Sequence, residues 1–166
     1  MNTFQRFGRS LFGGLAITSC LVAAAIAQED DVVGTWDCGL SVDDPASGTA
    51  VDADFETTYD ANGSYERDGQ LNISIAALQI DIAVAMDEVG NWRIVESTSR
   101  GETATEIRFS TPSGTPSPTE QMILQQMQAE ANEMLGKEEV AEITAISADS
   151  MELTSDDGAA LTCSKA

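Results

Sequence analysis

The chain has 166 residues, with 28 acidic residues, 8 basic residues and no histidine, so its net charge is −20 at pH 7. Such strong negative charge repels nucleic acids and anionic lipid headgroups, and we expect neither as a partner. The absence of histidine removes the most frequent general base and metal ligand of proteins, so we expect no metal site and no cofactor.

Residues 1–27 have the pattern of a secretory signal peptide. Arg6 and Arg9 are the only charged residues before Glu29, and an uncharged stretch over residues 10–27 follows them. The stretch ends in Ala25-Ile26-Ala27, the small-x-small pattern that signal peptidases cleave. We therefore expect one mature domain, residues 28–166, that is periplasmic or secreted.

Two alternatives concern the same apolar stretch. At 18 residues it is at the short end for a membrane-spanning helix, and we expect no integral membrane span after cleavage. The sequence Ile17-Thr18-Ser19-Cys20 resembles a bacterial lipobox, in which Cys20 would become the lipidated first residue. Seven apolar residues follow Cys20, which favours ordinary cleavage over lipid anchoring.

The mature chain would retain 6 basic and 28 acidic residues, a net charge of −22, and only two of the three cysteines. Its 139 residues suffice for one domain with its own core. Because cysteines that pair evenly in an oxidising compartment usually form disulfides, we expect a bond between Cys38 and Cys163. That bond would join the first strand of the domain to the last.

The first half of the mature chain shows mostly the two-residue period of β-strands. We expect strands at residues 32–40, 51–59 and 65–75, with a turn of residues 60–63 joining the last two. The inward positions of the first strand are Val32, Trp36, Cys38 and Leu40. In the second strand Asp52, Asp54 and Glu56 form the opposite face, which we expect to lie in water rather than to form a catalytic carboxylate pair.

The alternation shifts at Ala76-Ala77, which indicates a turn or bulge before an apolar strand over residues 78–86. We then expect a hairpin turn at Gly90-Asn91, a strand around residues 92–95 and another turn near Arg100-Gly101. A further strand follows over residues 103–109. Acidic turns such as Asp43-Asp44 lack the spacing of an EF-hand loop, and we expect no calcium site in them.

A helix is predicted over residues 118–135. Ser117 is suited to cap the helix, and Glu120 is suited to complete a capping box with it. Pro118 is suited to the first turn, and Gly136 is suited to end the helix. Short strands at residues 140–147, 150–154 and 159–164 complete the chain. The fold class is therefore mainly β: an antiparallel up-and-down barrel of eight or nine strands, with one helix before the last three strands.

The sequence Gly34-Thr35-Trp36 at the head of the first strand resembles the G-x-W signature of lipocalins and related bacterial lipocalin-like domains, which are calycin-type barrels. The resemblance implies that Trp36 closes one end of the barrel. Two features differ from the family. The helix precedes the final three strands instead of following the barrel, and the arginine that packs on the family's tryptophan has no match near the C-terminus, where only Lys165 is basic.

Arg67 interrupts the apolar face of its predicted strand, because it shares parity with Tyr65 and Leu71. An inward arginine needs an anionic partner, which is either a buried carboxylate or the head of a ligand such as a fatty acid. Alternatively, a bulge at Asp68-Gly69 or a position at the barrel rim leaves the guanidinium in water.

These patterns favour a binding protein that holds a small apolar or amphipathic ligand inside the barrel. The candidate ligand-binding residues are Arg67, Tyr65, Ile80, Met127 and Met134. The alternative is a small periplasmic protein that binds a protein partner through its surface, such as an inhibitor of an exported hydrolase. Small barrels of that kind also carry a buried tryptophan and a disulfide. No catalytic residues are predicted, since histidine is absent and both cysteines of the mature chain are expected to be bonded.

Overall fold

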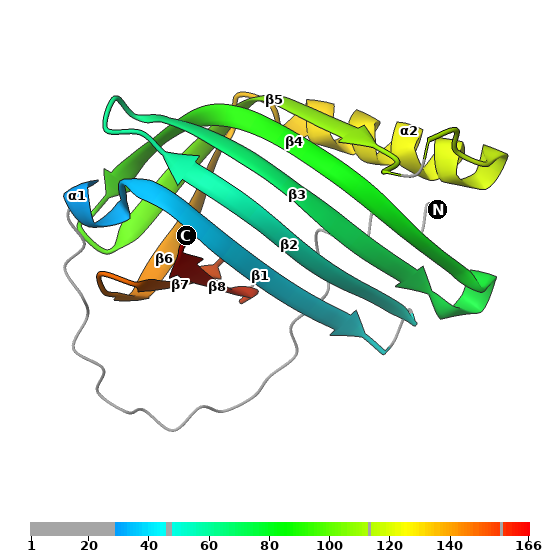
Figure 1. The fold of residues 1–166 in the computed structure, drawn as a ribbon, viewed down its shortest axis with the longest axis horizontal. Helices are drawn as coiled ribbons and strands as arrows, with labels where there is room; N and C mark the ends of the chain where they lie inside the picture. Colours follow the sequence, from blue (N-terminus) through cyan, green and yellow to red (C-terminus); the bar gives the residue numbers. More distant parts are fainter. Residues whose placement is uncertain (1–28, 46–47, 113, 157) are drawn as a thin grey trace.

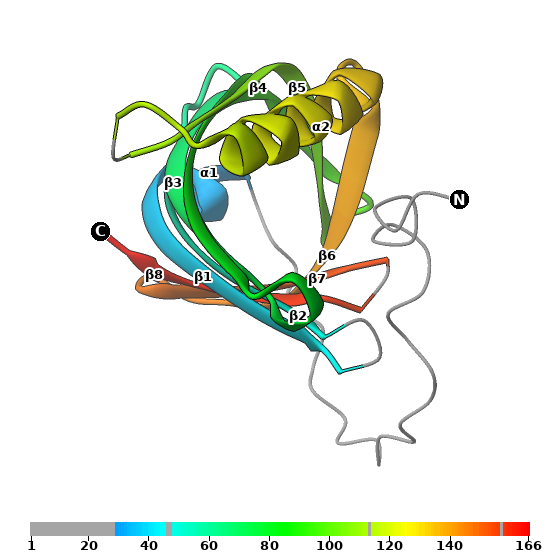
Figure 2. The ribbon, with the colours of Figure 1, turned by 90° about the vertical axis from the view of Figure 1, so that its right-hand side faces the viewer.

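The computed structural model describes residues 29–45, 48–112, 114–156 and 158–166. The predicted signal peptide, its cleavage site and Cys20 lie outside the described residues. Eight strands form a closed antiparallel barrel in which each strand pairs with the next and β8 returns to β1 (Figures 1 and 2). The up-and-down barrel with a helix before its last three strands is thus confirmed, with eight strands.

The chain begins with α1 (Glu29–Val32) and five long strands, β1 (Gly34–Asp44), β2 (Thr49–Tyr59), β3 (Ser64–Ile75), β4 (Ile80–Val95) and β5 (Ser99–Ser110). The helix α2 (Pro118–Met134) follows, and then three shorter strands, β6 (Glu138–Ile146), β7 (Ser150–Ser155) and β8 (Ala160–Lys165). A 3₁₀ helix (Ala76–Leu78) joins β3 to β4, where the shift of parity predicted a turn.

Three local predictions differ from the structure. Val32 ends α1 instead of beginning a strand, and its carbonyl accepts a hydrogen bond from Trp36 Nε1. Gly90-Asn91 does not form a hairpin turn but lies inside β4. The turn after β4 is centred on Glu96 and Ser97, which both have positive φ, and Arg100-Gly101 lies inside β5 instead of forming the predicted turn. Glycine occurs at position 90 because a Cβ there would lie 2.4 Å from a β5 carbonyl oxygen and 2.7 Å from the Tyr65 ring.

The interior contains two apolar clusters, one toward each end of the barrel. The first apolar cluster consists of Val32, Trp36, Cys38, Tyr59, Tyr65, Trp92, Ile143, Met151, Leu153 and Cys163. The second apolar cluster consists of Ile73, Ile75, Ile82, Val84 and Ile123. Because Ile123 comes from α2, the helix supplies part of the core at this end (Figure 2).

The barrel wall is complete only near the first cluster. Strand β1 pairs with β8 over residues 36–39, and β5 pairs with β6 over residues 99–103. Beyond those pairs β1 and β5 continue past the shorter strands, and α2 runs alongside β5 (Figure 1). We call this end, with the second apolar cluster, the α2 end.

The start of α2 follows the prediction. The Ser117 side chain accepts a hydrogen bond from the Glu120 backbone, and the Glu120 side chain accepts one from the Ser117 backbone. Pro118 occupies the first turn. None of the helices in the described part of the chain is both long enough and apolar enough to cross a membrane.

Candidate functional site

Arg67 points into the barrel and binds two glutamates whose side chains are only 11% and 12% exposed. Its Nη1 lies 3.2 Å from Oε1 of Glu88 on β4, and its Nη2 lies 2.9 Å from Oε2 of Glu102 on β5. Its Nε donates to the Thr57 hydroxyl at 3.1 Å. The pairing of β2 with β3 continues through Asp68 and Gly69 without a shift, so the bulge interpretation of Arg67 is wrong. Only 12% of the Arg67 side chain is exposed, so its guanidinium does not lie in water as the rim interpretation expected. The partners present in the structure are buried carboxylates.

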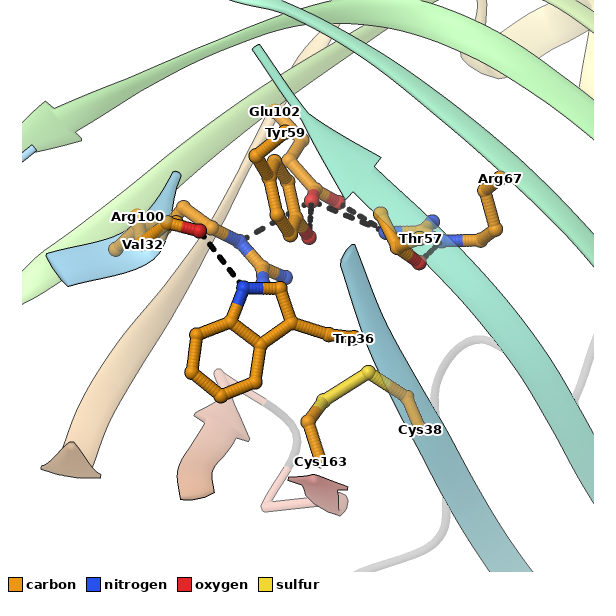
Figure 3. The surroundings of a disulfide bond; sticks show 9 residues. All are labelled: Val32, Trp36, Cys38, Thr57, Tyr59, Arg67, Arg100, Glu102 and Cys163. Atoms are coloured by element: carbon orange, nitrogen blue, oxygen red, sulfur yellow. Dashed lines mark hydrogen bonds and ion pairs between the residues drawn. A yellow bond between two sulfur atoms is a disulfide. The ribbon is translucent and has the colours of Figure 1, made fainter. Parts of the chain in front are cut away.

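Glu102 binds a second buried arginine. Arg100 Nε lies 3.1 Å from Glu102 Oε1, and only 4% of the Arg100 side chain is exposed. The Tyr59 hydroxyl donates to the same carboxylate, and the Arg100 guanidinium lies over the Tyr59 ring (Figure 3). Arg100 Nη1 is buried and has no hydrogen-bond partner among the residues that the structure describes. We call Arg67, Glu88, Arg100 and Glu102 the charge cluster.

Arg67 and Glu88 lie between the two apolar clusters, whereas Arg100 and Glu102 lie beside the first cluster, opposite Ile94 and Trp92. Along β3, Arg67 follows Tyr65 of the first cluster and precedes Ile73 of the second; along β4, Glu88 lies between Val84 and Trp92. The Arg67 guanidinium also lies 5.3 Å from the ring centroids of both Phe55 and Tyr65. Aromatic faces and carboxylates thus surround this cation, which compensates for the loss of its hydration.

The charges of the cluster fix the protonation of its members. Burial would raise the pKa of Glu102, but the charges of Arg100 and Arg67 and the hydrogen bonds from Tyr59 and Arg67 outweigh it and lower that pKa to about 2. Burial raises the pKa of Tyr59, and burial together with Glu88 raises the pKa of Tyr65. Burial lowers the pKa of Arg67, but the carboxylates outweigh this effect and raise it. At neutral pH Glu102 is therefore ionised and both tyrosines are protonated.

Sequence reasoning identified Arg67 but missed its partners. Glu88 shares the inward parity of Val84, but it lies just before Gly90-Asn91, where a hairpin turn was expected and β4 in fact continues. Glu102 was hidden by a bulge opposite Val89 and Gly90, where the pairing moves from Glu106 directly to Ala104. Because the bulge adds one residue, inward positions on β5 change from odd to even, and only the strand pairing reveals this.

Trp36 closes the other end of the barrel. Its ring is fully buried, and Lys165 Nζ lies 4.1 Å from the ring centroid. Lys165 also donates to the Val33 carbonyl, and a Cβ at Gly34 would lie 2.6 Å from Lys165 Nζ. The last strand thus supplies a cation over the tryptophan.

The predicted disulfide is present. Cys38 and Cys163 are direct partners in the β1–β8 pairing, and both are buried beside Trp36 (Figure 3). The bond closes the barrel between its first and last strands.

A cavity of about 130 Å³ adjoins the charge cluster where α2 ends. Its lining consists of Tyr65, Glu88, Glu102, Ala104, Ile107, Met134, Lys137 and Glu139. Two of the predicted ligand-binding residues, Tyr65 and Met134, therefore meet at this cavity, and Arg67 binds two of its carboxylates. The other two, Ile80 and Met127, pack against the second apolar cluster.

The outer face of strands β1–β4 is acidic. Asp37, Glu56, Asp68 and Asp87 are direct partners in successive pairings and form a row of exposed carboxylates, which we call the acidic row. An open hollow of about 570 Å³ adjoins three of them and Asp54. Within the described residues, no group of three or more cysteine, aspartate or glutamate side chains is placed to hold a metal ion.

No protein-family model and no curated protein matches the chain.

Proposed function

We propose that the chain is an exported, lipocalin-like binding protein that holds a small amphipathic ligand between α2 and the inner face of the barrel. The likeness to lipocalins is supported by the eight-stranded antiparallel barrel and by Gly34-Thr35-Trp36, with Trp36 closing one end under the Lys165 cation. Export to the periplasm or the medium is supported by the features of residues 1–27 and by the disulfide. Lipid attachment at Cys20 is the alternative form of processing.

The observation that carries the proposal is incomplete burial of inward-facing apolar side chains at the α2 end. Val51, Leu71, Ile80 and Phe109 all pack against the second apolar cluster, yet each is only partly buried. On β3 the neighbouring outward residue Asn72 is exposed, as alternation requires. The barrel therefore has apolar surface at the α2 end that the described residues cover only in part, and apolar surface of this kind favours an apolar ligand.

The proposal is one of binding and not of catalysis. Glu102 has a low pKa and Tyr59 a raised one, so neither exchanges protons readily at neutral pH. Both cysteines of the expected mature chain form the disulfide, so neither offers a thiolate nucleophile.

The experiment measures thermal unfolding of the mature protein with and without decan-1-ol, an uncharged amphiphile. A ligand that binds only the folded state adds about 2.7 kcal/mol at a hundredfold excess over its Kd, so the Tm should rise by several degrees. Leu71→Trp should abolish the rise, because its indole would fill the partly covered inner face. Asn72→Trp places the same side chain on the outer face and should leave the rise unchanged. An equal rise in both variants, or none in the wild type, would refute the proposal.

The acidic row favours a second candidate, a protein that binds a basic partner such as an exported hydrolase through its surface. Four carboxylates in register and the adjoining hollow present a concentrated negative charge to such a partner. The same experiment separates the candidates, since surface recognition gives no Tm rise with decan-1-ol.

A further inference from the structure

The cavity at the end of α2 is lined mainly by hydrogen-bond acceptors. Glu88, Glu102 and Glu139 contribute carboxylates, and Tyr65 contributes a phenol. The Tyr65 hydroxyl already donates its proton to Glu88, so toward the cavity its oxygen offers lone pairs. Apart from the ammonium of Lys137, the polar groups of the lining are acceptors, so the cavity favours donors on a ligand.

The buried arginines do not line this cavity. Arg67 directs its nitrogens to Thr57, Glu88 and Glu102, and Arg100 pairs with Glu102. An anionic head that entered the cavity would meet the carboxylates before it met either guanidinium. The net charge of −20 also attracts cations toward the protein and repels anions.

The size of the cavity matches a head group and not a whole ligand. Its volume of about 130 Å³ equals that of roughly four water molecules. Two apolar side chains of the lining lead from it toward the second apolar cluster. Ile107 precedes the inward-facing Phe109 by two residues on β5, and Met134 follows Met127 by seven residues, a helical distance of about 10 Å. A medium-length alkyl chain spans that distance.

We infer that the ligand is an amphiphile with a cationic head, a primary alkylammonium, whose head occupies the cavity beside Tyr65, Glu88 and Glu102 and whose chain lies under α2. This inference rests on the proposed function, because it assigns the head group of a ligand whose chain fills the same apolar surface. Lys137 also lines the cavity, so its charge opposes the ammonium and limits the affinity.

The test compares three probes with the same ten-carbon chain, decylammonium, decan-1-ol and decanoate, by calorimetric titration at pH 7. Decylammonium should bind at least tenfold more tightly than decan-1-ol, as expected for a charged hydrogen bond, and decanoate more weakly than either. Binding of decan-1-ol with no preference for decylammonium would overturn the inference and leave the proposed function standing. If decan-1-ol does not bind, the proposed function fails as well.

Two variants and a control test where the head group of the ligand lies. Glu88→Gln should lower the affinity for decylammonium about tenfold more than the affinity for decan-1-ol, because only the ammonium loses a charged hydrogen bond. Glu66→Gln removes one exposed carboxylate from the outer face of β3 and should change neither, which controls for general attraction to an acidic protein. Because Glu88 also binds Arg67, a second variant avoids the buried network: Lys137→Gln, at an exposed position, should tighten decylammonium and weaken decanoate. An unchanged ratio of the two affinities in Lys137→Gln would overturn the assignment.

Discussion

At the scale of single residues, the main feature is a set of charges buried inside a barrel. Arg67 and Arg100 converge on Glu102, and Glu88 binds the first of them. Such networks add little stability relative to apolar packing, but removal of one member leaves its partners buried and unpaired. The cluster therefore makes the barrel sensitive to changes in any of its four members.

Replacement of Glu102 by glutamine should destabilise the protein and make its free energy of unfolding less dependent on pH in the acidic range. The carboxyl has a pKa of about 2 in the folded protein and about 4.3 when unfolded, so its contribution is present above pH 4.3 and is lost as the pH falls toward 2. The difference corresponds to about 3 kcal/mol. Urea unfolding at pH 7 and pH 3 should show that the free energy of unfolding falls less on acidification in Glu102→Gln than in the wild type. The exposed Glu152→Gln, whose partner on β8 is Thr162, is the matched control. An equal loss of the free energy of unfolding on acidification in Glu102→Gln and the wild type would contradict the expectation.

At the scale of the elements, strands β1–β4 present different faces to the two environments. The inner face is apolar apart from the charge cluster and two buried threonines, Thr49 and Thr57. The outer face has like charges directly opposite one another. Burial raises the pKa of Asp68, and so do its hydrogen bond and its repulsion with Asp87. A raised pKa in a carboxylic acid means that the ionised form is disfavoured in the folded state, so stability falls as the pH rises through this group's titration.

The variant Asp68→Asn should therefore stabilise the protein. Removal of one charge from the acidic row should increase the free energy of unfolding by roughly 0.2 to 1 kcal/mol at low ionic strength. The gain should be larger at pH 7 than at pH 3 and should shrink in salt, which screens exposed charges. Asp54→Asn is the control, since Asp54 lies opposite Gly39 and Gln70, which carry no charge. Equal gains in the two variants would show that the row itself is not the cause.

At the scale of the whole molecule, closure depends on a short seam. Among the described residues, the pairing of β1 with β8 covers residues 36–39 and 162–165, and the disulfide lies within that seam. The crosslink encloses 125 positions of sequence, which removes about 4 to 5 kcal/mol of chain entropy from the unfolded state on a loop-closure model.

Reduction of the disulfide should lower the free energy of unfolding and loosen the seam first. The reduced wild type, kept in dithiothreitol, should unfold at a lower urea concentration than the oxidised protein of identical sequence. Amide hydrogen exchange should accelerate at residues 36–39 and 162–165 while the paired centres of β2, β3 and β4 stay protected. Unchanged exchange in the seam after complete reduction would show that its hydrogen bonds alone hold it closed.

The sequence by itself determined much of the architecture, because strand alternation and helix caps are local signals. The period of two placed β2 and β3, the capping box placed the start of α2, and the even number of cysteines after the expected cleavage predicted the disulfide. Parity also placed Arg67 inside the barrel.

Only the tertiary structure decided what Arg67 meets and where a cavity forms. Both depend on which strands are neighbours and on their register, and the bulge between Val89 and Gly90 changes which β5 residues face inward. Gly90 illustrates the same limit: glycine is typical of turns, yet here it makes room for the Tyr65 ring of the neighbouring strand. A local pattern carries no information about such a contact, because the atoms that require it come from another part of the chain.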